Sequence, residues 1–118
     1  MFSLRQDTPV TNREISLRRL GGDEILLATL AGFFLEDAPA LMIQLNHAHD
    51  SGDFAMVAHR AHGLKGLSAT FEAVPFMQLA TEIELLARAG DHYHINEAIP
   101  QLQTEFDRLT AELRPLVS

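Results

Sequence analysis

Three residues in one short segment have the types and the spacing needed for phosphoryl chemistry. His62, Lys65 and Gly66 all lie in the stretch AHGLKGLS, residues 61–68. On a helix, residues three or four apart share a face, so the ammonium of Lys65 lies one turn from the imidazole of His62. An imidazole nitrogen is a nucleophile, and a flexible point charge suits an anionic phosphoryl group attached to that ring. The combination of the two residues is therefore compatible with an anionic group on the ring, although a solvated surface lysine is the commoner explanation of Lys65 alone.

The helical face around His62 consists of small side chains. When residues 54–72 are projected as a helix, the core stripe consists of Val57, Ala61, Leu64, Ser68 and Phe71. The face of His62 instead carries Ala55, Ala58, Ala69 and Gly66, with His59 at its margin. Long charged side chains usually fill a solvent-facing patch, and small ones leave room for another protein. We expect this face to be a docking surface with His62 exposed on it.

Gly66 supports the interpretation of this face as a docking surface. A glycine inside a helix costs about 1 kcal/mol relative to alanine. Close packing of a neighbouring helix would explain the alanines of this face but not the glycine, because alanine packs nearly as closely. We interpret Gly66 as clearance for the active site of a partner protein that closes over His62.

Helices must position these residues, because apolar residues recur at spacings of three and four and no segment alternates strictly. The clearest stripes are Phe76, Leu79, Ile83 and Leu86, and then Leu102, Phe106, Leu109, Leu113 and Leu116. The fold class is therefore all-α: an antiparallel four-helix bundle with an additional short N-terminal helix. Residues 1–118 form a single domain, with a flexible tail expected over residues 1–10 and the bundle over about residues 12–115.

Capping and breaking residues divide the chain into these helices. We expect Thr11 or Asn12 to begin the short helix, and Asp23, Asp53 and residues near Asp91 to begin later ones. Val74-Pro75 should end the helix that contains His62 and begin another, and Gly21, Gly22 and Gly90 should end helices. Pro39 is expected to break or kink its helix, and Pro100 either to kink the last helix or to mark its true start; Pro115 blocks its continuation.

Charge and composition exclude several functions. Nine basic residues stand against sixteen acidic ones, giving a net charge of −7, and clustered basic residues of the kind that bind nucleic acid are missing. There is no cysteine, so no disulfide, thiol nucleophile or thiolate metal site is available. The sequence shows neither a signal-peptide pattern nor a run of about 18 apolar residues. These features predict a cytoplasmic, monomeric partner of proteins without membrane contact.

Nearly the whole chain from residue 13 resembles the histidine phosphotransfer (HPt) domains of two-component phosphorelays. The segment AHGLKGLSATFEAVPFMQLATEIE, residues 61–84, matches the family signature, written roughly as A-H-x-L-K-G-x-S followed by an apolar-patterned helix that ends in L-E. The GGD and GD turns upstream also match. The combination of these motifs is more specific than H-x-L-K-G alone.

The resemblance implies a four-helix bundle in which His62 is phosphorylated, Lys65 steadies the phosphoryl group and Gly66 gives clearance. It also implies that Glu84, on the following helix, orients the imidazole. The expected partners are response-regulator receiver domains, which would supply Mg²⁺, and this chain needs no cofactor of its own. Leu67 and Glu72 depart from the family pattern, which has a small polar residue and a glycine there. Without that glycine, the end of the helix should depend on Pro75.

Other functions remain open at this stage. A helical adaptor could bind through the same patch without chemistry, or an ATP-bound kinase domain could phosphorylate the histidine directly. The chain contains no nucleotide-binding motif and is therefore not a kinase by itself, although it could be one domain of a hybrid sensor kinase. His59 and His62 could share a metal with a carboxylate, but no metal site is expected. The pairs His47/His49 and His92/His94 do not share helical faces.

Overall fold

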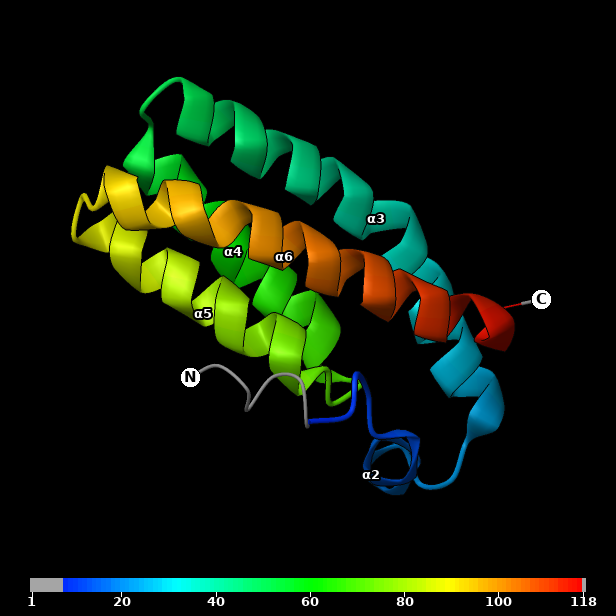
Figure 1. Ribbon diagram of the computed structural model, residues 1–118. Helices are drawn as coiled ribbons and strands as arrows, with labels where there is room; N and C mark the ends of the chain where they lie inside the picture. The colour runs from blue at the N-terminus through cyan, green and yellow to red at the C-terminus, as the bar shows by residue number, and fades with distance from the viewer. Residues whose placement is uncertain (1–7, 118) are drawn as a thin grey trace.

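Four of the five α-helices in the described part of the chain begin next to a side chain that caps them, and the fifth begins with a proline in its first turn. The computed structural model describes residues 8–117, and these residues form five α-helices and one 3₁₀ turn without a strand (Figure 1). The elements are α2 (Arg13–Arg19), α3 (Glu24–Asp50), α4 (Phe54–Ala69), α5 (Val74–Arg88), α6 (His92–Leu113) and the 3₁₀ turn η1 (Arg114–Leu116). The long helices α3–α6 form an antiparallel bundle, and the short α2 lies at one end of it. The all-α prediction is confirmed.

The helix starts agree with the capping chemistry of the sequence. The side chain of Asp53 accepts from the Met56 amide at 3.1 Å, and that of Asp23 accepts from the Leu26 amide at 2.9 Å. Asn12 caps α2 and Asp91 caps α6 in the same way, both at 3.1 Å. Each cap is worth about 1 kcal/mol because it satisfies an amide that the first helical turn leaves unpaired.

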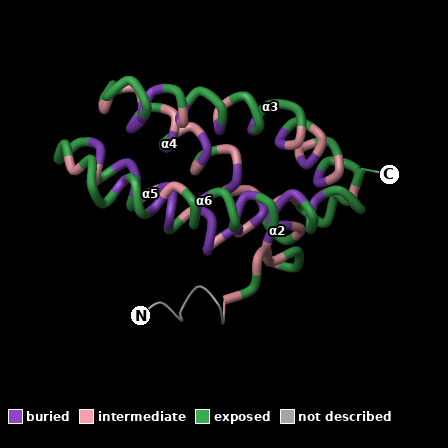
Figure 2. The backbone as a smooth tube through the Cα atoms, turned by 45° about the horizontal axis from the view of Figure 1, so that its top comes forward, coloured by how far each residue is buried: buried purple, intermediate pink, exposed green. Residues whose placement is uncertain are grey.

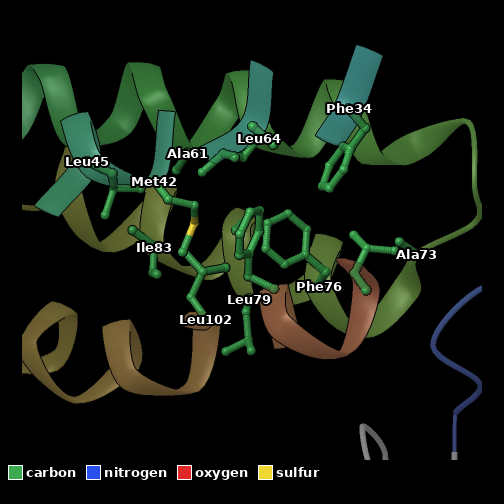
Figure 3. Packing of buried hydrophobic residues seen from close by; sticks show 14 of the residues in the cluster. Phe34, Met42, Leu45, Ala61, Leu64, Ala73, Phe76, Leu79, Ile83 and Leu102 are labelled. Carbon is green, nitrogen blue, oxygen red and sulfur yellow. The ribbon is translucent and has the colours of Figure 1, made fainter. Parts of the chain in front are cut away.

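The core is apolar and lies along the axis of the bundle. Buried residues face inward from all four long helices (Figure 2). Phe34 on α3 lies at the centre of an aromatic group, with ring centroids 6.0–6.4 Å from those of Phe71, Phe76 and Phe106. Leu79 and Ile83 continue this core along α5 (Figure 3). In sequence order each long helix packs on the next, and α6 returns to contact α3.

Neither internal proline divides a helix. Of the two alternatives expected at Pro39, the break is wrong, since α3 runs unbroken from Glu24 to Asp50. Pro100 does not mark the start of α6, which begins at His92. Both prolines are exposed. The carbonyl that each ring leaves without a helical hydrogen bond therefore lies on the water-facing side of its helix, while the buried side holds both halves in the core.

The long helix α3 is apolar on more than its buried side. Its most apolar 18 residues have a mean hydropathy of 1.6, so by length and composition it could cross a membrane. This differs from the expectation that no segment reaches such a composition. Part of the cause is that Ile25, Phe33 and Ile43 are more than half exposed, in addition to the buried residues that face the bundle. Because α3 packs along α4, we interpret it as a bundle helix.

Within the described residues, contacts with the bundle begin inside the segment that was expected to be a flexible tail. Residues 1–7 of the expected tail lie outside the described part of the structure. Val10, inside the same expected tail, packs against the core, and the amide of Asn12 donates to the carbonyl of Phe71 at 3.1 Å.

The end of α4 differs from the prediction. We expected Pro75 to end this helix, but α4 ends at Ala69, and Glu72 takes the left-handed conformation with φ 51°. The residue that replaces the family glycine thus adopts the backbone conformation typical of glycine. An ion pair of 2.5 Å with Arg19 on α2 accompanies this strained residue.

Two substitutions of Glu72 separate the backbone strain from the ion pair. Glu72→Ala and Glu72→Gly both remove the contact with Arg19, but only alanine keeps the left-handed strain. We expect the glycine variant to have a free energy of unfolding about 1 kcal/mol higher than the alanine variant. Urea unfolding measures the difference, and equal stabilities would contradict the assigned conformation.

The start of α6 predicts a pH-dependent stability. A hydrogen bond of 2.6 Å between His94 Nδ1 and Asp91 raises the pKa of His94 above its ordinary 6.5 and lowers the pKa of Asp91. The raised pKa means that protonated His94 stabilises the fold fully below pH 6.5, and that this contribution is lost as pH rises through the higher value. As pH rises above 6.5, wild-type stability should therefore fall more steeply than that of His94→Gln. Parallel slopes in urea titrations would contradict the pair.

Candidate functional site

The fold exposes His62 and buries the opposite side of its helix. Val57, Ala61 and Leu64 are each 0% exposed and point into the bundle, as the helical projection predicted. The side chain of His62 is 63% exposed, so the ring stands in solvent. A helix with one face locked in the core holds this imidazole on a rigid support.

Glu84 lies against the inner nitrogen of this ring. Its Oε1 is 3.3 Å from His62 Nδ1, and its side chain is 11% exposed. Because an ionised carboxylate only accepts hydrogen bonds, the neutral ring carries its proton on Nδ1 and keeps a lone pair on Nε2. The half-exposed ring therefore presents a nucleophilic nitrogen to solvent while its other nitrogen is held by the protein.

The same carboxylate also contacts two cations. Arg88 donates to Glu84 Oε2 at 2.8 Å, and the Lys65 ammonium lies 3.6 Å from Oε1. The hydrogen bond from Arg88, followed by that from His62 and the charge of Lys65, lowers the pKa of Glu84 even though burial opposes the shift. Glu84 is therefore ionised at neutral pH and able to accept from His62.

Lys65 and Gly66 lie on the exposed side as predicted, but the ammonium does not stand free. Lys65 is 31% exposed and leans toward Glu84 rather than extending into solvent. A Cβ added at Gly66 would meet no atom within 4 Å, apart from its own helix and neighbours. The space over this glycine is open, so no packing inside the protein requires it.

A hollow beside His62 contains three of the four residues predicted for docking. It is lined by Phe54, Ala55, Ala58, His59, His62, Ala87 and Arg88. Ala55 and His59 are exposed, whereas Ala58 is only 5% exposed and contributes to the wall rather than to an open face. Ala69, at the far end of α4, does not line the hollow.

The wall that α5 contributes was not among the predicted docking residues. Ala87 and Arg88 line the hollow from α5, and Arg88 also binds Glu84. The spacing of Glu84 and Arg88 was the available signal, because a Glu four residues before an Arg forms a favourable helical pair.

The remaining histidines lie apart from this arrangement. The rings of His49 and His92 stack with centroids 4.6 Å apart, and His49 Nε2 lies 3.3 Å from Asn96 Oδ1. Within residues 8–117, no three His, Cys, Asp or Glu side chains are arranged to hold a metal ion. These histidines are best described as surface and packing residues.

An exposed, oriented histidine on a helical bundle, without a nucleotide-binding motif, is typical of a phosphotransfer module rather than a kinase. Comparison with known families agrees: residues 29–112 match the model of the Hpt domain. The chain belongs to the Hpt domain family, and its role is histidine phosphotransfer in phosphorelays.

Two known proteins are similar to this chain. Phosphotransferase RcsD of Escherichia coli (strain K12) is 30% identical over 101 residues, which cover 83% of this chain and 11% of RcsD. The chain thus spans about one ninth of the length of that relative. Histidine-containing phosphotransfer protein B (HptB) from Pseudomonas aeruginosa PAO1 has the same fold, with a TM-score of 0.83 and 24% identity over 92% of this chain and 95% of that one.

Proposed function

We propose that His62 accepts a phosphoryl group from the aspartyl phosphate of one receiver domain and passes it to another. The observation that carries this proposal is the contact of Nδ1 with Glu84, which leaves Nε2 free on the exposed side of the ring. Gly66 leaves the approach to the ring open. The hollow beside His62, which three alanines line together with Phe54, His59 and Arg88, is the surface proposed for the docked partner.

From this chain, the transfer uses the imidazole of His62 as nucleophile and the carboxylate of Glu84 beside it. The Nε2 lone pair forms the new bond to phosphorus, and the bond between phosphorus and the receiver carboxylate oxygen breaks, with the electron pair leaving on the carboxylate. The ring gains positive charge, which the ionised Glu84 stabilises through Nδ1–H. The second transfer reverses these steps toward another receiver aspartate, and positioning supplies most of the catalysis.

Mg²⁺ would come with the receiver domain in this proposal. The carboxylate next to His62, that of Glu84, already contacts Arg88 and Lys65. A carboxylate paired with two cations is a poor ligand for a third, so the residues of this site do not fit a magnesium ion of their own. The metal would act in the acidic pocket of the partner.

The setting of the domain is part of the proposal. Hpt domains in phosphorelays interact with receiver domains and are generally soluble. We expect this one to work in the cytoplasm as a monomeric single domain. Both a free protein and a domain of a hybrid sensor kinase are compatible with the fold.

The test is transfer from a receiver domain that has been phosphorylated with acetyl phosphate and Mg²⁺. The chain should take up phosphate that is labile in acid and stable in base, as a phosphoramidate bond is. Labelling by an ATP-bound kinase domain in the absence of any receiver would instead favour direct phosphorylation. Binding of a receiver without transfer in either direction would favour an adaptor and contradict the proposal.

A further inference from the structure

Two cations from different helices share the carboxylate of Glu84, and they hold it unequally. Arg88, on the same helix as Glu84, donates at 2.8 Å, within the range of a charge-assisted hydrogen bond. Lys65, on α4, lies 3.6 Å away, too far for a hydrogen bond. Arg88 therefore forms the close contact, and Lys65 is held only by charge.

The pairing of Glu84 with Arg88 is favoured by local geometry. The two residues are four apart on α5 with the acid nearer the N-terminus, the better order for a helical ion pair. The acid is 11% exposed, so it needs a partner that neutralises it away from water. Without Arg88, Lys65 is the cation that could move in to form that close contact.

Lys65 would then be unavailable for its own task. Its side chain can bind either the buried carboxylate or a phosphoryl group on Nε2, which lies on the outer side of the ring. A lysine locked onto Glu84 would leave the phosphoryl charge without its nearby ammonium. The balance between the two cations thus decides how readily Lys65 can serve the transfer.

We propose that Arg88 is a positioning residue that occupies Glu84 and so keeps Lys65 free to reach the phosphoryl group on His62. The proposal rests on the proposed function of His62. Arg88 binds Oε2 of Glu84, whereas Oε1 lies 3.3 Å from His62 Nδ1 and 3.6 Å from the Lys65 ammonium, so it is this looser contact that would tighten if Arg88 were lost. A neutral amide at position 84 could orient the imidazole without a cation beside it. The carboxylate of Glu84 needs a cation, and Arg88 supplies it.

Two other roles for Arg88 make different predictions. If Arg88 touched the phosphoryl group itself, its loss would slow transfer whatever residue stood at 84 or 65. If Arg88 only bound the receiver, since it is 63% exposed on the hollow, its loss would leave labelling by a small reagent unchanged. The proposed role requires that the effect of Arg88 depend on both Glu84 and Lys65.

The experiment measures labelling of His62 by phosphoramidate, a small donor that needs no docking surface. In this reaction Nε2 forms a bond to phosphorus, the phosphorus–nitrogen bond of the reagent breaks, and ammonia leaves. Rates are followed by mass spectrometry for wild type and Arg88→Ala, and for the same substitution in Glu84→Gln and Lys65→Ala backgrounds. Circular dichroism and urea unfolding show that each variant is folded.

We expect Arg88→Ala to slow labelling about fivefold in the wild-type background. In the Glu84→Gln and Lys65→Ala backgrounds the same change should alter the rate less than about twofold, since no capture of the lysine can occur. Arg88→Lys should recover part of the rate because it restores a cation beside Glu84.

The outcomes separate this proposal from the function on which it rests. An equal slowing in all three backgrounds, or no slowing in the wild type, would overturn the role of Arg88 while leaving His62 as the phosphorylated residue. Wild-type protein that takes no label at His62 from either phosphoramidate or a phosphorylated receiver would instead overturn the proposed function.

Discussion

Replacing His62 by glutamine is expected to abolish phosphoryl transfer while leaving the bundle intact. Glutamine has no nucleophilic nitrogen, so neither a receiver domain nor a small donor can place a phosphoryl group there. The ring is 63% exposed and its helix is held by residues on the opposite face, so stability should change by less than about 1 kcal/mol. Labelling with a phosphorylated receiver, followed by urea unfolding, measures both effects.

The matched control for this substitution is His47→Gln. His47 is an exposed histidine on α3 that does not line the hollow at His62. It should keep full transfer, so any loss in His62→Gln cannot be attributed to the removal of a surface imidazole in general. Acid-labile label on His62→Gln would mean that another residue is the acceptor.

The second large effect concerns Gly66, where stability and transfer should change in opposite directions. Gly66→Ala is expected to raise the free energy of unfolding by about 1 kcal/mol, because helix propensity improves and the added Cβ meets open space. Gly66→Gln should be less stabilising but should slow transfer from a phosphorylated receiver by about 10²-fold, since its side chain fills the approach to His62. Labelling by phosphoramidate should stay near the wild-type rate, because that reagent is small.

Gly63→Ala is the control for helix propensity. A Cβ at Gly63 would meet Leu41 of α3 at 3.6 Å, an ordinary contact with a neighbouring helix of the bundle. It should stabilise the helix similarly without slowing transfer. If Gly66→Gln transferred phosphate at the wild-type rate, the interpretation of this glycine as clearance would be wrong.

Local chemistry made much of the fold predictable. Asp23 and Asp53 cap their helices through bonds that span three residues, and Gly90 has φ 70° just beyond the end of α5. Such features need no knowledge of distant parts of the chain. The periodicity of apolar residues was equally informative, because the side that it placed in the core is the side that is buried.

The failures arose where tertiary packing overrides a local preference. Pro39 lies within an unbroken helix because the residues around it are held in the core. Glu72 ends up left-handed because the chain must turn from α4 into α5 whether or not a glycine is present. Ala58 was expected on an open face, but it is only 5% exposed and lies in the wall of a hollow to which α5 also contributes. The packing around Pro39, Glu72 and Ala58 involves other elements of the fold, which the sequence of a single helix does not identify.

The part of the candidate site that lies on one helix was predictable, and the part that depends on a second helix was not predictable from spacing. His62, Lys65 and Gly66 share one helical turn, so their common face follows from spacing. The register between α4 and α5 came only from the family resemblance, and it places Glu84 beside His62. The role proposed for Arg88 required the two unequal distances to Glu84, which no spacing rule supplies.

The partners of His62 come from the next helix in the chain, and this has a consequence for how the protein folds. His62 and Glu84 are only 22 residues apart in sequence, and the turn of residues 70–73 joins their helices. Contacts of short sequence separation close quickly because little loop entropy is lost. We expect the helical hairpin of α4 and α5 to bring the nucleophile and its orienting carboxylate together early in folding, before α6 completes the bundle.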